Sequence, residues 1–160
     1  MKRDAFSLIE LLIVIAIILV IAMIAIPNLI RSRISANEAS AVGSLRTINE
    51  GERVYFSTYN TGYSPNLQSL GPGSDGPTAS AAGLIDSVLA GTGSTSTKNG
   101  YTFTYSSKPD TAGRYNVYTL TAAPSKPGTT GVKYYYTDQT STIRQSSGRQ
   151  AGASDTPYGQ

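Results

Sequence analysis

The most pronounced pattern in the chain is an uninterrupted apolar segment near its start. Residues 6–26 read FSLIELLIVIAIILVIAMIAI, and Glu10 is the one charged residue among them. A stretch of about 20 apolar residues is long enough to cross a bilayer as a helix. A carboxylate at mid-membrane costs roughly 2.5–3.5 kcal/mol, and less near the surface. A simple anchor does not need this carboxylate, so Glu10 is a candidate functional residue.

A secretory signal and a plain anchor are the alternatives for this segment. A cleaved secretory signal has an apolar core of about 7–15 residues followed by a small-residue cleavage site. The segment here is longer, and a helical pattern follows it where a cleavage site would be expected. A plain single-span membrane anchor carrying a binding domain stays open as an alternative.

Helical spacing continues beyond Pro27 as one apolar stripe with three- or four-residue steps. Its members are Leu29, Ile30, Ile34, Val42, Leu45, Ile48, Phe56 and Tyr59. The pattern predicts one nearly continuous helix over residues 6–59, about 80 Å long at 1.5 Å per residue. Pro27 lacks an N–H and should bend this helix. Gly43 and Gly51 either weaken it or let another backbone come close.

Shorter elements follow the helix. Alternating apolar and polar residues, or runs rich in β-branched and aromatic residues, predict strands at 101–105, 114–122, 132–137 and 142–144. The fold class is therefore α+β, with a long N-terminal helix and an antiparallel sheet of about four strands packed on its second half. The predicted segments are an apolar helix half (6–28), an amphipathic helix half (29–60), a Gly/Pro/Ser-rich loop region with a short helix at 80–90 (61–99), the sheet (100–145) and a loose tail (146–160).

Composition limits the chemistry. The 160 residues leave room for one small soluble domain beside the apolar segment. Thirteen basic and ten acidic residues give a net charge of +3, which is too small and too scattered to indicate nucleic acid by itself. Cysteine and histidine are absent, which excludes disulfides, thiolate or imidazole metal ligands, and Cys/His or Ser/His nucleophile pairs. We therefore expect a protein that is not an enzyme and has no cofactor.

Three further groups of residues are candidate sites, and each has a simpler interpretation. Asp75 in its Gly/Pro loop has no second carboxylate nearby, whereas calcium takes six to eight oxygen ligands, so no metal is expected. Aromatic residues at the helix end could conduct electrons, but packing under a sheet is the simpler expectation; they are Tyr55, Phe56 and Tyr59. Charged residues on the second helix half should form surface and subunit-to-subunit pairs, with a DNA-binding stripe as the alternative. These residues are Arg31, Arg33, Arg46, Arg53, Glu38, Glu50 and Glu52.

The N-terminal sequence FSLIELLIVIAIILVIAMIAIP resembles the type IV pilins and the related pseudopilins, through Phe6, Glu10, the Leu/Ile/Val run and Pro27. The resemblance extends more loosely along the chain as helix, loop and antiparallel sheet. It implies that residues 1–5 are a short basic leader. A membrane-embedded prepilin peptidase would cut between Ala5 and Phe6 and methylate the new amino terminus. Ala5 departs from the glycine that the family usually has before the cut.

The resemblance also implies a role for the N-terminal residues in assembly. The mature helix would leave the inner membrane and pack into the core of a helical homo-oligomeric filament on the cell surface. Cleavage before Phe6 would create an amine one helical turn from Glu10. Pairing Glu10 with the amine of a neighbouring subunit would neutralise two charges and fix the register; contact with its own amino terminus is the alternative.

The functional prediction is a major pilin of a type IV pilus that serves adhesion, twitching motility or DNA uptake. A pseudopilin of type II secretion, which forms a short periplasmic piston, is the first alternative. Major pseudopilins commonly carry a calcium loop in their C-terminal part, where this chain offers only Asp138 and Asp155. This difference favours a pilin.

Overall fold

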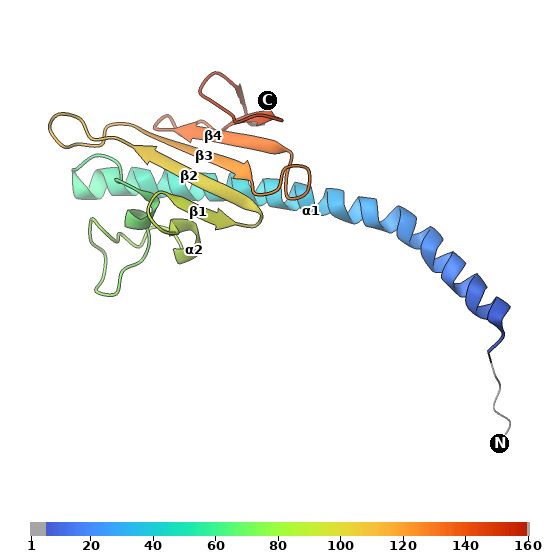
Figure 1. The fold of residues 1–160 in the computed structure, drawn as a ribbon. Helices are drawn as coiled ribbons and strands as arrows, with labels where there is room; N and C mark the ends of the chain where they lie inside the picture. The colour runs from blue at the N-terminus through green and yellow to red at the C-terminus, as the bar shows by residue number, and fades with distance from the viewer. Residues whose placement is uncertain (1–5, 160) are drawn as a thin grey trace. The chain divides into compact units, whose positions relative to one another are not determined.

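The predicted long helix is α1 (Leu8–Tyr59), which has 52 residues and continues through Pro27, Gly43 and Gly51 (Figure 1). The computed structural model describes residues 6–159. The chain divides into two compact units, and the boundary between Arg33 and Ile34 falls inside α1. The first unit consists of residues up to Arg33, and the second contains the rest of α1 and all other elements.

The second unit contains one six-stranded sheet in which every neighbouring pair is antiparallel and the strands follow one another in chain order. The strands are β1 (Thr95–Lys98), β2 (Tyr101–Ser107), β3 (Tyr118–Pro124), β4 (Lys133–Asp138), β5 (Arg144–Ser147) and β6 (Thr156–Pro157). The α+β fold class is confirmed, with six strands where about four were predicted.

The core of the second unit lies between α1 and the inner face of the sheet. Alternate residues of β2 and β3 are buried, which is the pattern of strands with one face packed on a core. The cluster joins Ala41, Val42, Leu45, Ile48 and Tyr55 of α1 to Tyr101, Phe103, Tyr105, Tyr118, Leu120, Ala122 and Tyr135 of the sheet. The helix stripe predicted from the sequence therefore contributes to this core through Val42, Leu45 and Ile48.

Polar groups also connect helix and sheet, through the buried Asn49 and the half-buried Glu38. Asn49 donates from Nδ2 to Thr137 Oγ1 at 3.0 Å and accepts at Oδ1 from the Tyr118 hydroxyl at 3.0 Å. Glu38 accepts from the backbone N–H groups of Val132 (3.0 Å) and Lys133 (3.2 Å). These bonds fix the register of the sheet along α1, because buried polar groups that lose their partners are costly.

The first two strands form a tight hairpin that the sequence prediction assigned to a loop. Lys98 pairs with Tyr101, so the connection has two residues, Asn99 and Gly100. Their φ angles of 48° and 75° are both positive, as a type I′ hairpin turn requires. The 91–99 segment thus contains β1.

Two other predicted elements are shorter than expected. The helix predicted over 80–90 is confined to α2 (Ser87–Ala90), because the preceding backbone N–H groups donate to carbonyls of residues 69–71. The strand predicted from residue 114 begins only at Tyr118. The residues from Asp110 to Arg114 form a turn instead, because Asp110 accepts from the N–H groups of Ala112 (2.8 Å) and Arg114 (2.9 Å).

The C-terminal segment 146–160 also differs from the loose tail predicted. Its described residues complete β5 and form β6, which pairs with β5 through Arg144 and Gln145. Arg144 donates to the Asp155 carbonyl at 2.9 Å, and the Tyr158 N–H donates to the Ile143 carbonyl at 2.8 Å. These contacts with β5 hold the segment against the edge of the sheet.

Candidate functional site

The first unit exposes almost all of its apolar side chains. Exposed fractions of the large apolar residues between Phe6 and Ile30 run from 45% at Ile30 to 82% at Leu8. Consecutive residues are exposed, so the apolar surface surrounds the helix on every side. Among residues 6–159, α1 is the one helix long and apolar enough to cross a membrane. Apart from the bond that Pro27 cannot make, its backbone groups are paired within the helix, so lipid or other apolar helices can surround this half.

Glu10 lies in the first turn of α1, on this exposed surface. Its backbone N–H donates to the Ser7 carbonyl at 3.1 Å. Phe6, two residues before the helix begins, is 80% exposed. Ala5, the other predicted processing residue, lies outside the described residues. A carboxylate in the first turn interacts favourably with the helix dipole, and its exposure leaves it accessible to a second chain.

Pro27, the third predicted assembly residue, lies inside α1. It cannot donate to the Met23 carbonyl, so one bond of the helix is absent at this turn. The next residue, Asn28, donates from its side chain to the Ile24 carbonyl at 3.0 Å. The predicted bend at Pro27 and its role in assembly stay predictions.

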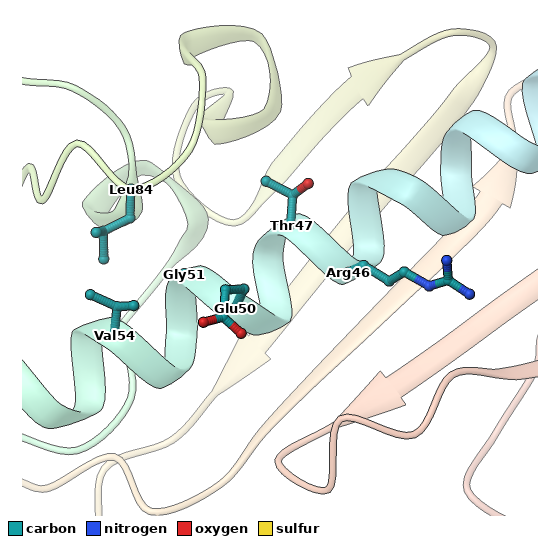
Figure 2. A pocket seen from close by; sticks show the side chains of 6 residues that line it. All are labelled: Arg46, Thr47, Glu50, Gly51, Val54 and Leu84. Carbon is teal, nitrogen blue, oxygen red and sulfur yellow. The ribbon is translucent and has the colours of Figure 1, made fainter.

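A shallow hollow of about 400 Å³ lies on the exposed face of the second half of α1 (Figure 2). Its lining residues are Arg46, Thr47, Glu50, Gly51, Val54 and Leu84. A Cβ on Gly51 would meet Ile85 Cγ2 at 3.3 Å and Leu84 Cβ at 3.6 Å. The absence of a side chain at Gly51 therefore lets the loop that contains Leu84 and Ile85 approach the helix closely. The hollow offers an apolar floor with one residue of each charge at its rim. It resembles a contact surface more than an active site.

The acidic residues of α1 do not all pair with arginines as predicted. Glu50 pairs with Arg53 at 3.1 Å, and both side chains are more than half exposed, so this pair contributes little to stability. Glu38 binds backbone N–H groups at the start of β4 instead. The DNA-binding stripe stays an untested alternative.

Glu52 corrects the prediction of surface pairing, because its side chain is completely buried. Its carboxylate accepts from the Ser64 backbone N–H at 2.9 Å and from the Ser64 hydroxyl. Burial raises the pKa of Glu52, although the Ser64 hydrogen bonds act in the opposite direction. Sequence reasoning missed this residue, yet its spacing from Ile48 and Tyr55 places it on the buried side of the helix.

Two of the three aromatic residues at the end of α1, Tyr55 and Tyr59, pack against the core as predicted. Tyr55 is 2% exposed, and its ring lies 4.7 Å from that of Tyr59. Phe56 is 42% exposed and contacts Tyr63, with 4.9 Å between ring centroids. Burial raises the pKa of Tyr105 and Tyr118 far above the usual range, so these phenols stay neutral. The electron-transport alternative stays untested.

Of the acidic residues considered for calcium, Asp75 is exposed, and Asp138 and Asp155 bind protein donors. Asp138 accepts from the backbone N–H of Thr140 at 2.9 Å, and Asp155 binds Arg149 and the Gly152 N–H. No group of three or more acidic residues within positions 6–159 is arranged to hold a metal ion.

Comparison with known proteins gives one match. Residues 1–26 match a family model described as the prokaryotic N-terminal methylation motif. The match includes Phe6, Glu10 and the exposed apolar residues up to Ile26, and it ends one residue before Pro27. No curated protein and no solved structure matches the chain.

Proposed function

We propose that this chain, a pilin- or pseudopilin-like protein by its methylation motif, is the major subunit of a type IV pilus. The observation that carries the proposal is the apolar surface of residues 6–30, which is exposed on every side of a helix that begins with the methylation motif. Prepilin processing and membrane anchoring of the precursor follow from the motif and the apolar helix.

The proposed mechanism is reversible polymerisation. Prepilin peptidase cuts between Ala5 and Phe6, and the apolar helix is stored in the inner membrane. Extraction into a filament then transfers the same side chains from lipid to neighbouring subunits. Burial from water is worth about 25 cal/mol per Å² of apolar surface, which opposes release of the subunit into solution. The filament serves adhesion, twitching motility or DNA uptake outside the cell.

Glu10 provides the register in this mechanism. Its carboxylate lies in the first turn and is exposed, which leaves it accessible to a neighbour. In the proposed filament it pairs with the methylated amine of an adjacent subunit. A subunit shifted along the filament leaves both charges unpaired in an apolar core, at a cost of several kcal/mol. In the second unit, the hollow around Thr47 and Val54 offers a further contact surface for a neighbouring subunit.

The pilin assignment is preferred over a pseudopilin because the described C-terminal region offers no calcium loop. Asp138 and Asp155 are bound by protein donors there. An enzyme is not proposed, because the sequence has no histidine or cysteine and no convergent catalytic group accompanies the hollow on α1.

The test is intact-mass and N-terminal analysis of filaments sheared from cells. We expect long surface filaments that contain a chain beginning at N-methylated Phe6. A short periplasmic assembly would indicate the pseudopilin. A chain found only in membranes and beginning at Met1 would overturn both assignments and leave the anchored binding domain.

A second test targets Glu10. Glu10→Ala should abolish surface filaments, or efficient methylation, while membrane insertion is retained. Asp75→Ala is the matched control, because Asp75 is an exposed acid outside both the motif and the hollow on α1. Normal piliation by the Glu10 variant would contradict the proposed register.

A further inference from the structure

The outer face of the sheet carries a repeated pattern that the proposed assembly does not use. The three strands β1, β2 and β3 each contain the sequence Thr-x-Thr: Thr95 and Thr97, Thr102 and Thr104, Thr119 and Thr121. The residue between each pair is buried, and these residues are Ser96, Phe103 and Leu120. The six threonines are exposed or half-buried, so all of them face away from α1.

Strand pairing aligns these threonines into rows across the sheet. Thr104 lies opposite both Thr95 and Thr121, and Thr102 lies opposite Thr97. Neighbouring strands are about 4.8 Å apart, and alternate residues along a strand about 6.8 Å. The outer face therefore presents a regular array of hydroxyl and methyl groups.

Two aromatic rings extend the array on the next strand. Tyr134 and Tyr136 of β4 are half-buried on the same face, while Tyr135 between them is 1% exposed. Tyr136 pairs with Thr121, so its ring stands at the end of the threonine row. A half-exposed tyrosine offers an apolar ring face and a polar tip to a ligand.

Charged residues lie only at the margins of this array. The outward positions of β1, β2 and β3, which the structure describes completely, hold only threonine, serine and alanine. The first charged neighbours are at the margins, where Asp138 lies opposite Thr119 and Arg144 lies opposite Tyr136. The Tyr136 hydroxyl donates to Asp138 Oδ2 at 3.3 Å, so this tyrosine offers a ligand mainly its ring face. A polyanion would need lysine or arginine in the array. A protein partner of the usual kind would need a larger apolar or arginine-rich centre.

We propose that this outer sheet face, defined by the six threonines with Tyr134 and Tyr136, binds an uncharged polysaccharide. Threonine hydroxyls both donate and accept, as the hydroxyls of a neutral sugar do. The tyrosine rings pack against the C–H face of sugar rings. Neither side has to desolvate a charge. The inference deepens the adhesive role within the proposed function and rests on it for avidity, because a filament displays many copies of one weak site.

The experiment uses the full-length chain, both as sheared filaments and as monomers in mild detergent. Binding is measured by sedimentation with insoluble cellulose and chitin, with the anionic polymer alginate for comparison. We expect both forms to bind a neutral polymer in preference to alginate, and the filaments to bind more tightly. Absence of binding to both neutral polymers by both forms would overturn the inference.

Matched variants locate the binding. Thr104→Lys places a charge in the centre of the array and should weaken binding about tenfold or more. Thr111→Lys is the control, because Thr111 is exposed outside the sheet. Tyr134→Ala should weaken binding about two- to tenfold, and Tyr134→Phe should retain it, because the ring face makes the contact. Circular dichroism checks that each variant is folded. Equal binding by Thr104→Lys and Thr111→Lys would place the site elsewhere and overturn the proposal.

Two further outcomes separate the possible failures. A regular threonine array could instead bind ice. The polysaccharide proposal would be overturned if the protein bound neither polymer but was retained on ice, with retention lost in Thr104→Lys and kept in Tyr134→Ala. Monomers that bind but never form filaments would support this inference and contradict the proposed pilin. Filaments that form normally but do not bind would contradict this inference alone.

Discussion

The two halves of α1 contain similar residue types in opposite environments. Leu19 in the first half is 65% exposed, whereas Leu45 in the second half is completely buried against the sheet. The second half has a protein core within its own chain. The first half has none among the described residues of its unit, so its apolar surface requires lipid or other chains. One helix thus combines a segment stabilised within the monomer with a segment stabilised only by its surroundings.

The two glutamates at positions 10 and 52 repeat this contrast. Glu10 is exposed in an apolar segment, and Glu52 is buried against Ser64. The carboxylate of Glu52 already has its partners within the folded unit. The carboxylate of Glu10 gains one only on assembly, in the mechanism proposed above. Substitutions at the two positions should therefore affect different measurements.

The largest expected effect comes from one substitution made in both halves. Leu45→Ala removes a fully buried side chain and should lower the free energy of unfolding of the second unit by about 2–5 kcal/mol. Leu19→Ala should change that free energy by less than about 0.5 kcal/mol, because Leu19 does not contribute to this core. Chemical unfolding in mild detergent, followed by the near-UV circular dichroism of the tyrosines, measures both.

Filament yield is the second measurement for the two leucine variants. Leu19→Ala should act on filament yield, where its side chain would be buried by neighbours. If Leu19→Ala destabilises the second unit as much as Leu45→Ala does, the two halves are not energetically separate. The contrast drawn above would then be wrong.

The next effect concerns Glu52. Glu52→Ala leaves the Ser64 N–H without its acceptor and should cost about 1–3 kcal/mol. Glu52→Gln keeps an acceptor for this N–H and offers a donor to the Ser64 hydroxyl, so it should cost less. Unfolding of both variants at neutral pH tests this order, and an equal loss in the two would mean that the hydrogen bonds are not the cause.

The pH dependence of stability gives an independent check on Glu52. Burial raises its pKa above the ordinary 4.5, so the folded chain holds this proton more tightly than the unfolded chain. The associated stability is fully present below pH 4.5 and is lost as the pH rises through the raised pKa. Glu52→Gln should remove this fall, and the exposed control Glu50→Gln should retain it.

The parts of this fold that were predictable from sequence have strong local patterns. The helix and the strands around Phe103 and Tyr135 alternate or repeat clearly, and their residues form the core. The β1–β2 hairpin was missed although its Asn99-Gly100 turn is a strong local signal, because the flanking Thr-Ser-Thr has no apolar alternation. Glu52 was missed because its charge was given more weight than its position on the buried side of the helix.

Other features could not be predicted from local sequence. β6 has two residues and depends on contacts of Arg144 and Ile143 with residues more than ten positions away. The processing and assembly roles predicted for Ala5, Phe6, Glu10 and Pro27 involve other molecules, so they stay predictions. Their chemistry becomes visible only with a peptidase or a neighbouring subunit.

A smaller effect is expected at two glycines of the region after α1 that have nearly equal, positive φ angles. Gly62 has φ 94° and Gly76 has φ 91°, so Ala at either position costs about 1–2 kcal/mol. A Cβ on Gly62 would also lie 2.3 Å from the Tyr115 carbonyl oxygen, which accepts from the Tyr63 N–H at 2.7 Å. Gly76 has open space around it.

Thermal unfolding of the two alanine variants separates the two contributions. Gly62→Ala should be the less stable by about 1 kcal/mol, because the clash disturbs the bond to Tyr63. That result would show that the bond between Tyr63 and Tyr115, just after α1, also stabilises the second unit. Equal unfolding midpoints for Gly62→Ala and Gly76→Ala would show that this bond contributes little. The core alone would then explain why the second half of α1 is stable within the monomer.

The smallest effect belongs to a surface ion pair of the second unit. Lys98 Nζ lies 2.9 Å from Asp86 Oδ2, with both side chains partly exposed. Lys98 lowers the pKa of Asp86, so the pair stabilises the fold above the ordinary carboxyl pKa and is lost as the pH falls through the lowered value. Lys98→Met should cost about 0.2–1 kcal/mol, and less in high salt. Asp86→Ala should cost about 1 kcal/mol more, because Asp86 also accepts from the Leu89 N–H at the start of α2.

A loss from Lys98→Met as large as that from Leu45→Ala would mean that surface charge, not the buried core, stabilises this unit. Burial would then no longer explain why one half of α1 is stable within the monomer while the other depends on its surroundings.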